Sequence, residues 1–147
     1  MKNIIDTSEI ISFAESLSGS AKELKRSENK FLRTQGTKLR RKTAQRARTT
    51  VRKTAVDRKK YKREAGQYHK SIKRGKVYVQ NGDKQIRVYS NDPIAHLIED
   101  GYTPKLRNKK AGPHQMGKKV FETARNSFEP DFQKAAEEFI DEVIDTI

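Results

Sequence analysis

Cysteine is absent from the 147-residue sequence, and so is any long apolar run. Without cysteine the chain cannot form disulfides, thiolate metal sites or cysteine nucleophiles. No stretch of about 18 apolar residues occurs, so we expect no transmembrane helix. Met1–Asp6 carries one lysine and no long apolar stretch, and we therefore expect no secretory signal.

Apolar side chains make up only 33% of the residues, whereas 35% of the residues are charged. This length suits one ordinary domain, and we expect residues 1–147 to form a single domain with a small core. Such a composition is also compatible with segments that become ordered only against a partner.

Patterns typical of catalytic and metal sites are missing as well. His69, His96 and His114 do not have the spacing of a zinc motif. The glycines of residues 112–117 lack the spacing of a phosphate-binding loop. We therefore predict no enzyme activity, no cofactor and no metal. A small nuclease or toxin that uses these histidines as general acid and base is a remote alternative.

The charge is strongly positive and unevenly distributed, with a formal net charge of +14. Residues 21–76 contain 22 lysines and arginines against four acids, whereas residues 129–147 contain seven acids and one base. A basic balance of this size favours contact with a polyanion. The separation of the two signs also suggests surfaces that meet opposite charge, for instance on neighbouring copies of the same chain.

Helical spacing of apolar residues predicts the N-terminal half of the chain. A capping pattern at Asp6–Glu9 begins a helical arm within residues 1–20. Ser20, with an acid three residues later, repeats the pattern before a long helix from about Ala21 to about Val56. Gly36 is the point where we expect this helix to bend.

A β-hairpin is predicted in the middle of the chain. Lys76–Gln80 and Gln85–Tyr89 alternate between apolar and polar residues, and Asn81-Gly82 is a favoured turn between two strands. Tyr78 and Tyr89 could stack on nucleic-acid bases, although tyrosines on strands more often pack against their neighbours.

The C-terminal third combines one ambiguous segment, one loop and two helices. Pro93–Glu99 fits either a third strand or a helical turn. Residues 102–117 have no periodic pattern and form a basic loop that is either functional or disordered. A helix follows from Lys118 to Phe128. Pro130 then suits the start of a separate acidic helix over residues 129–147, whose apolar stripe is more often core than interface.

Basic residues on and just after the loop could face a neighbouring subunit or DNA, although a merely solvated loop is equally compatible with the sequence. They are Lys105, Arg107, Lys109, Lys110, Lys118 and Lys119. Glu99 and Asp100 precede the loop, and a lone acidic pair at a turn is more often a helix cap or an ion-pair partner than a catalytic dyad.

Short motifs in a fixed order resemble those of phage head–tail joining proteins, also called tail-completion or minor neck proteins. Ala65–Ile72 resembles that family's threonine-glycine, hydrophobe, serine-isoleucine element. Ile94–Gly101 resembles its tyrosine-alanine, hydrophobe, glutamate, x, glycine element. Ala65 replaces the usual threonine, and Ile94 the frequent tyrosine. The resemblance extends from about Leu24 to Phe128, and the positions that carry it are Gly66, Tyr68, Ser71, Ile72, Ala95, Glu99, Gly101, His114, Phe121 and Ala124.

The resemblance implies an α+β fold with a long N-terminal helix, a small, largely antiparallel sheet with a β-hairpin, and C-terminal helices. It implies a structural subunit of the phage neck, assembled in the host cytoplasm and located in the virion. The subunits would form a ring, expected to be hexameric, that joins the capsid connector to the tail and lets DNA pass. Partners would be other copies, neighbouring neck or tail proteins and, non-specifically, DNA, with no membrane and no catalysis.

A basic, non-specific nucleic-acid-binding accessory protein is the main alternative. Lysines and arginines on a long helix could neutralise phosphates, and binding would then depend on salt. No zinc finger, helix-turn-helix or aromatic-rich RNA-binding strand is visible, so any contact with DNA would be with its backbone. The level of the ring in the neck, the tail type and the host are left open by the sequence.

Overall fold

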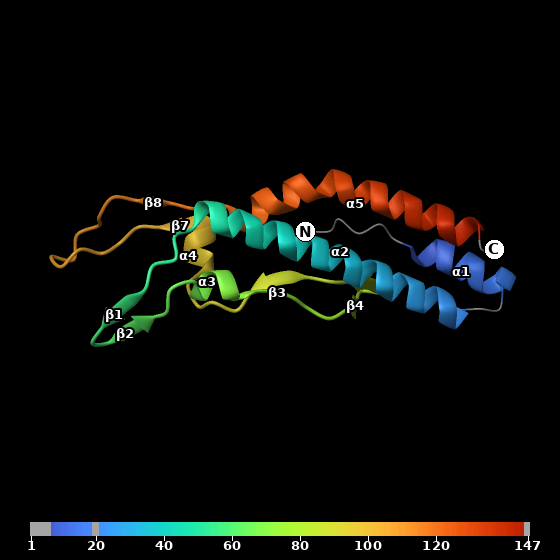
Figure 1. Cartoon of the computed structure of the whole chain (residues 1–147), viewed down its shortest axis with the longest axis horizontal. Helices are drawn as coiled ribbons and strands as arrows, with labels where there is room; N and C mark the ends of the chain where they lie inside the picture. Colours follow the sequence, from blue (N-terminus) through green and yellow to red (C-terminus); the bar gives the residue numbers. More distant parts are fainter. Residues whose placement is uncertain (1–6, 19–20, 146–147) are drawn as a thin grey trace. The chain divides into compact units, whose positions relative to one another are not determined.

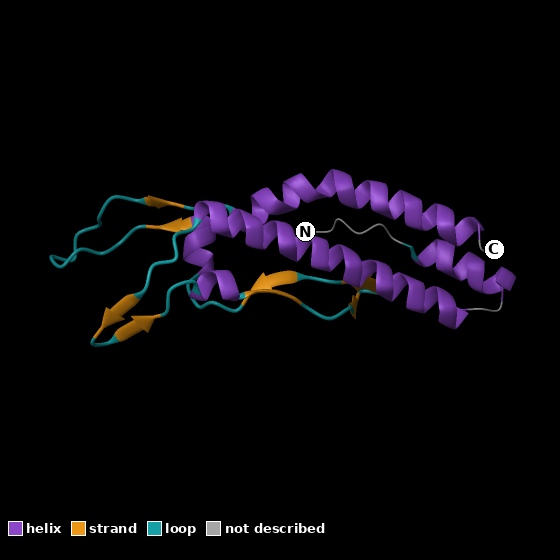
Figure 2. Cartoon of the chain, viewed as in Figure 1, coloured by secondary structure: helices purple, strands orange, loops and turns teal. Residues whose placement is uncertain are grey.

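The computed structural model describes residues 7–18 and 21–145 of the chain. Its main elements are three helices, α1 (Ser8–Ser18), α2 (Ala21–Thr50) and α5 (Val120–Asp145) (Figure 1). Short strands and two short helices connect α2 to α5 (Figure 2). The strands form two-stranded sheets, so the predicted α+β class with a long N-terminal helix and small antiparallel sheets is confirmed.

Helix α1 begins at Ser8, where the spacing of apolar residues predicts a helix. The hydroxyl of Thr7 donates a 2.6 Å hydrogen bond to the buried carboxylate of Glu28, which joins the start of α1 to α2. Asp6 and Ser20, the predicted capping residues of the two helices, lie outside the described residues.

Helix α2 ends at Thr50, so the predicted end at about Val56 is wrong. β-Branched residues at the end of the helix weaken its propensity to continue. His69 also binds the last turn, because its Nε2 lies 3.1 Å from the Ala47 carbonyl oxygen and 2.9 Å from that of Val51. A side chain that donates to the final carbonyls in this way replaces the hydrogen bonds of a further turn.

A hairpin that the sequence analysis missed follows α2. Strand β1 (Val56–Arg58) pairs antiparallel with β2 (Tyr61–Arg63), and Arg58 lies opposite Tyr61. The two residues at its turn, Lys59 and Lys60, are exposed.

The predicted Asn-Gly hairpin is confirmed. Strand β4 (Tyr78–Gln80) pairs antiparallel with β5 (Asp83–Gln85), and both turn residues have positive φ, 53° at Asn81 and 83° at Gly82. The return strand begins at Asp83, two residues before the predicted start at Gln85, and it ends at Gln85 because Ile86 and Arg87 leave the ladder.

The residues after this break form a second pairing. Strand β6 (Val88–Ser90) pairs with β3 (Ile72–Arg74), which precedes the hairpin, instead of continuing β5. The short helix α3 (Gln67–Lys70) comes just before β3.

Most of the segment from Pro93 to Glu99 is helical, since α4 spans Ala95–Asp100. The loop that follows contains paired backbone, although its sequence has no periodic pattern. Strands β7 (Gly101–Tyr102) and β8 (Gln115–Met116) pair antiparallel, and a further bridge joins Lys105 to Ala111.

Helix α5 runs without a break through Pro130, so the prediction of two helices separated at residue 129 is wrong. Proline costs a helix one hydrogen bond and some steric strain, about 3 kcal/mol. The helix continues because apolar residues are spaced by four on both sides of the proline, and burial of that stripe offsets the loss. The buried members of the stripe are Val120, Ala124, Phe128, Ala136 and Val143.

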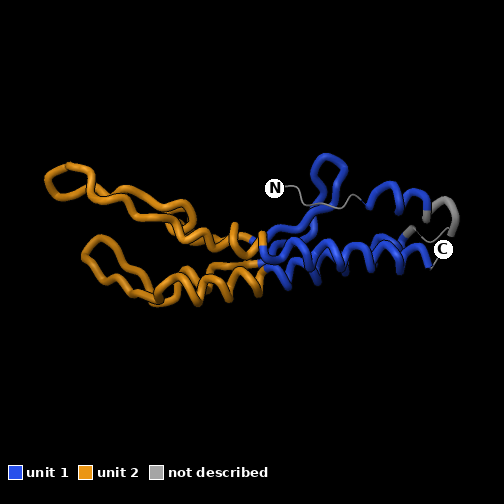
Figure 3. Tube along the Cα trace, turned by 90° about the horizontal axis from the view of Figure 1, so that it is seen from above, with its two compact units in different colours: residues 1–39, 74–88, 127–147 blue, residues 40–73, 89–126 orange. Residues whose placement is uncertain are grey.

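The chain divides into two compact units, and both long helices contribute to each (Figure 3). Unit 1 comprises residues 1–39, 74–88 and 127–147. Its core is aromatic, because Phe31 stacks on Phe139 with ring centroids 4.6 Å apart and also lies 6.0 Å from Phe132. Gly36 is buried within an uninterrupted α2, where an added Cβ would lie 2.9 Å from Ile86.

Unit 2 comprises residues 40–73 and 89–126. Its core lies where α2, α3, β3 and the start of α5 meet. The fully or nearly fully buried side chains there are Thr43, Ala47, Tyr68, Ile72, Val120 and Ala124.

Candidate interaction surface

All ten positions that carry the family resemblance fall in unit 2. Tyr68, Ser71, Ile72 and Ala124 are buried, whereas His114 is exposed. These four positions therefore belong to the core of unit 2.

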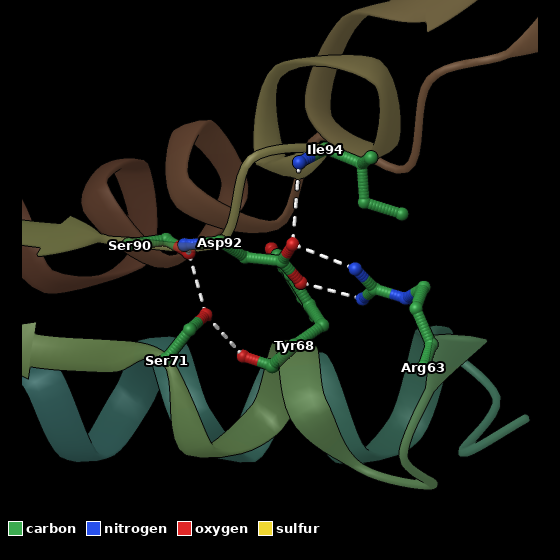
Figure 4. Close-up of polar contacts among 6 residues, drawn as sticks. All are labelled: Arg63, Tyr68, Ser71, Ser90, Asp92 and Ile94. Atoms are coloured by element: carbon green, nitrogen blue, oxygen red, sulfur yellow. Dashed lines mark hydrogen bonds and ion pairs between the residues drawn. The ribbon is translucent and has the colours of Figure 1, made fainter. Parts of the chain in front are cut away.

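Side-chain and backbone hydrogen bonds connect α3 to the segment before α4 (Figure 4). The hydroxyl of Ser71 donates to the Tyr68 carbonyl oxygen and lies 2.5 Å from the hydroxyl of Ser90. The backbone N–H of Asp92 donates in turn to Ser90. Ser71 is therefore held by its environment, which explains a serine at this position without any catalytic role.

Asp92 and Arg63 form a buried ion pair beside these bonds (Figure 4). Arg63 Nη1 donates to Asp92 Oδ1 at 2.8 Å, and Nη2 donates to Oδ2 at 2.5 Å. The Asp92 side chain is fully buried, and that of Arg63 is 10% exposed. These hydrogen bonds hold the pKa of Asp92 below its ordinary value.

The same carboxylate also accepts a hydrogen bond from the backbone N–H of Ile94, at the start of α4. Asp92 therefore fixes β2 to the entrance of α4. The sequence analysis missed both members of the pair, because no local pattern indicates a partner 29 residues away.

The hydroxyl of Tyr68 is buried and has no hydrogen-bond partner among the described residues. Burial raises its pKa, and the nearby carboxylates of Glu99 and Asp92 raise it further. A neutral phenol of this kind packs as an aromatic core residue.

The three histidines do not form a common site in the structure. His69 binds the end of α2, His96 is exposed on α4, and His114 Nδ1 lies 3.0 Å from the hydroxyl of Thr103. No group of three or more histidines and carboxylates able to hold a metal ion occurs in residues 7–18 and 21–145.

Glu99 caps α5 from a distance in sequence. Its two carboxylate oxygens accept 3.0 Å hydrogen bonds from the backbone N–H groups of Phe121 and Glu122, which have no partner within the helix. A negative charge at this end also interacts favourably with the helix dipole. The predicted capping role of Glu99 is therefore confirmed.

Its neighbour Asp100 makes the other predicted kind of contact. The carboxylate lies 3.3 Å from Lys119 Nζ in an exposed ion pair. Backbone bonds reinforce this junction of α4 and α5, because Lys118 N–H donates to the Ile98 carbonyl oxygen and Lys119 N–H to that of Glu99.

Two glycines lie back to back at the start and end of the paired loop, which we call the basic arm (Gly101–Gly117). A Cβ on Gly101 would lie 2.3 Å from the Gln115 carbonyl oxygen, and one on Gly117 would lie 2.3 Å from that of Glu99. Gly101 also has a φ of 86°, which only glycine adopts readily. The arm is therefore pinned at its root by backbone packing.

The tip of the arm, Leu106–Lys110, is an ordered turn. Lys109 N–H donates to the Leu106 carbonyl oxygen, and Leu106 N–H donates to that of Lys110. Lys109 has a φ of 60°, which is the geometry of a three-residue hairpin loop that ends in a left-handed residue. The Asn108 side chain accepts a hydrogen bond from Lys110 N–H and supports this turn.

All six predicted basic residues of the arm and its root are exposed: Lys105, Arg107, Lys109, Lys110, Lys118 and Lys119. The arm contains no acid. The β1–β2 hairpin (Val56–Arg63) is a second basic projection of unit 2, and Figures 1 and 3 show both projections extending from the same end of that unit.

No helix in the part of the chain that the structure describes is long and apolar enough to cross a membrane.

Comparison with known proteins gave one family. Residues 8–101, from the first turn of α1 to the root of the basic arm, match the family model described as "Bacteriophage HK97-gp10, putative tail-component". No curated protein and no solved structure gave a significant match. Because the matched residues are more than half of the chain, the protein belongs to the HK97-gp10-like family of bacteriophage tail components.

Proposed function

We propose that this protein is a structural subunit of the neck of a tailed phage or phage-like particle. In this role several copies form a ring, expected to be hexameric, that joins the capsid connector to the tail and lets DNA pass. The family match is the observation that carries the proposal, because it covers α1, α2, both hairpins between α2 and α4, and α4. The role requires assembly and includes no catalysis, cofactor or metal.

The distribution of charge supports assembly into a ring. A ring subunit needs two different surfaces that fit each other, because the interface between neighbours is head to tail. Exposed lysines and arginines cover much of α2 and of the basic arm, whereas the last turns of α5 are acidic on their exposed face. Surfaces of opposite charge bring such faces together and select their register.

The proposed location is the virion, with assembly in the host cytoplasm. Neighbouring neck proteins, such as the connector, a tail terminator or the tail tube, would be the other partners. DNA in the lumen would meet exposed lysines and arginines of this protein. These side chains would contact only the phosphate backbone of the DNA.

A basic nucleic-acid-binding accessory protein is the second candidate, and the net charge of +14 favours it. The two candidates make opposite predictions for the isolated chain. A neck subunit assembles beyond the monomer, alone or with adjacent neck proteins. An accessory protein binds duplex DNA tightly as a monomer, with an affinity that falls steeply with salt.

Light scattering and native mass spectrometry of the purified chain, with and without the proteins encoded next to it, would separate the candidates. A DNA-binding titration at several salt concentrations completes the test. We expect a defined oligomer and weak DNA binding. A monomer in every mixture that binds DNA tightly would refute the neck proposal.

A further inference from the structure

The basic arm presents apolar side chains together with its bases. Tyr102, Leu106 and Met116 are 45%, 48% and 81% exposed. Contacts with a phosphate backbone need cations and hydrogen-bond donors but no exposed leucine or methionine. Protein interfaces, in contrast, are enriched in tyrosine, methionine and arginine. The composition of the arm therefore favours a protein partner over nucleic acid.

The backbone of the arm is also held in a fixed conformation. Strands β7 and β8 pair only with each other among the described residues. A lone two-stranded hairpin is marginally stable in water, but the arm is held by its glycine root and by an ordered tip. A projection fixed in this way loses little conformational freedom when it binds, which favours affinity.

The exposed lysines and arginines of the arm indicate that its partner is acidic. Lys105, Arg107, Lys109 and Lys110 are exposed, and none of them makes an ion pair with another described residue. Their partner must therefore supply several carboxylates and, for the leucine and methionine, some apolar surface.

The outer face of α5 has this chemistry. At 100° per residue, one broad face of its last turns is lined by acids, with Ile144 at its edge. Ile144 is 56% exposed. No ion pair joins these acids to another described residue. We call this the α5 acidic face, and its exposed carboxylates belong to Glu137, Glu138, Asp141, Glu142 and Asp145.

We propose that the basic arm of one copy docks on the α5 acidic face of a second copy. The arm bases pair with the carboxylates, and Leu106 and Met116 contact Ile144. Because the two surfaces differ, each copy offers one of each, and the contact repeats from copy to copy until a ring closes. This inference rests on the proposed ring and identifies the surfaces that build it. The arm beyond Gly101 and all of α5 lie outside the residues matched by the family model.

Two charge-reversed variants test the docking. The arm variant carries Lys105→Glu, Arg107→Glu, Lys109→Glu and Lys110→Glu, and the helix variant carries Glu138→Lys, Asp141→Lys, Glu142→Lys and Asp145→Lys. Each variant alone presents like charges to itself, so its self-association should weaken by at least about tenfold. An equal mixture should assemble again, because each reversed surface then meets its complement on the other variant. Sedimentation velocity at low and high salt measures both effects.

A matched control reverses the same number of bases on the neighbouring hairpin of unit 2, with Arg58→Glu, Lys59→Glu, Lys60→Glu and Lys62→Glu. It should assemble as the unchanged protein does. Circular dichroism verifies that every variant is folded. Assembly of the mixed arm and helix variants would show independently that both of them are folded.

The outcomes separate this inference from the proposed function. A chain that never assembles refutes the ring itself. Assembly that the arm variant leaves intact refutes the docking but not the ring, as does a mixture that stays dissociated. Loss of DNA binding by the arm variant, with unchanged assembly, would assign the arm to DNA and overturn the docking.

Discussion

At the scale of single residues, Asp92 shows how one carboxylate can fix two segments that are distant in sequence. It accepts two hydrogen bonds from Arg63 on β2 and one from Ile94 at the start of α4. Removing one partner of a buried ion pair is costly, because the other charge stays buried without compensation.

Asp92→Asn should therefore lower the free energy of unfolding by about 3 kcal/mol at neutral pH. Folding lowers the pKa of Asp92 from 3.8, so its stabilisation is fully present above that value and is lost as the pH falls through the lower pKa of the folded state. The difference between variant and unchanged protein should shrink in the same direction. Urea denaturation at neutral pH and at about pH 3 measures it.

Asp57→Asn is the matched control. Asp57 forms a 3.7 Å ion pair with Lys62 on the same hairpin, but their side chains are 86% and 77% exposed. Exposed pairs contribute little, so this variant should unfold almost as the unchanged protein does. Equal losses in the two variants would contradict the special role of Asp92.

Substitutions at three glycines measure the cost of a positive φ apart from the cost of steric contact. Gly82 has a φ of 83° and open space around it, Gly117 has close backbone neighbours, and Gly101 combines both conditions. Gly82→Ala should cost about 1 kcal/mol, the price of a left-handed alanine. Gly101→Ala and Gly117→Ala should each cost more than about 2 kcal/mol. Denaturant unfolding compares them, and a Gly101→Ala variant as stable as Gly82→Ala would contradict the pinned root.

At the scale of elements, α5 depends on a cap supplied by α4. Glu99→Ala leaves the N–H groups of Phe121 and Glu122 without acceptors, and should lower the free energy of unfolding by about 1 kcal/mol. Hydrogen exchange of these two amides should become faster. Asp100→Ala is the adjacent control, because its carboxylate reaches only the exposed Lys119. Unchanged exchange in the Glu99 variant would show that the cap is dispensable.

Elements specified by neighbouring residues were predicted well. The Asn-Gly turn fixes the β4–β5 hairpin because both residues tolerate positive φ, and helical spacing reveals α1 and most of α2. Element boundaries that depend on distant contacts were not predicted correctly. Helix α2 ends where His69 binds its carbonyl groups, and α5 continues through Pro130 because burial on both sides outweighs one lost hydrogen bond.

The candidate surface likewise combines features set by neighbouring residues with features set by contacts distant in sequence. The bases of the arm are visible in the sequence, and so is the preference of Glu99 for a structural role. The pairing of the arm and the contact of its two root glycines require segments that meet only in the fold. The β1–β2 hairpin was missed because two three-residue strands give too little alternation to distinguish them from the end of a basic helix.

At the scale of the whole molecule, the dominant property is a net charge of +14 on 147 residues. Such a charge repels itself and destabilises the compact monomer. Contact with opposite charge on another molecule relieves this repulsion. In the proposed neck role, assembly and stability would therefore be coupled.

Salt should reveal that coupling in the isolated chain. Raising the ionic strength shortens the screening length from about 30 Å at 0.01 M to about 8 Å at 0.15 M. The Tm of dilute protein should rise over this range, because repulsion is screened. The arm variant, with a lower net charge, should show a smaller rise. Scanning calorimetry measures both proteins, and a Tm that falls with salt would show that attractive surface pairs dominate instead.

The close backbone contacts that hold the basic arm lie at its root, at Gly101 and Gly117. Residues 103–114 extend beyond that root and contribute no buried side chain to either unit. They can therefore diverge in length and composition without disturbing the scaffold that holds them. If the arm docks on α5 as proposed, a change in the arm would require a matching change only on the exposed face of α5, while the buried side chains of both units stayed as they are.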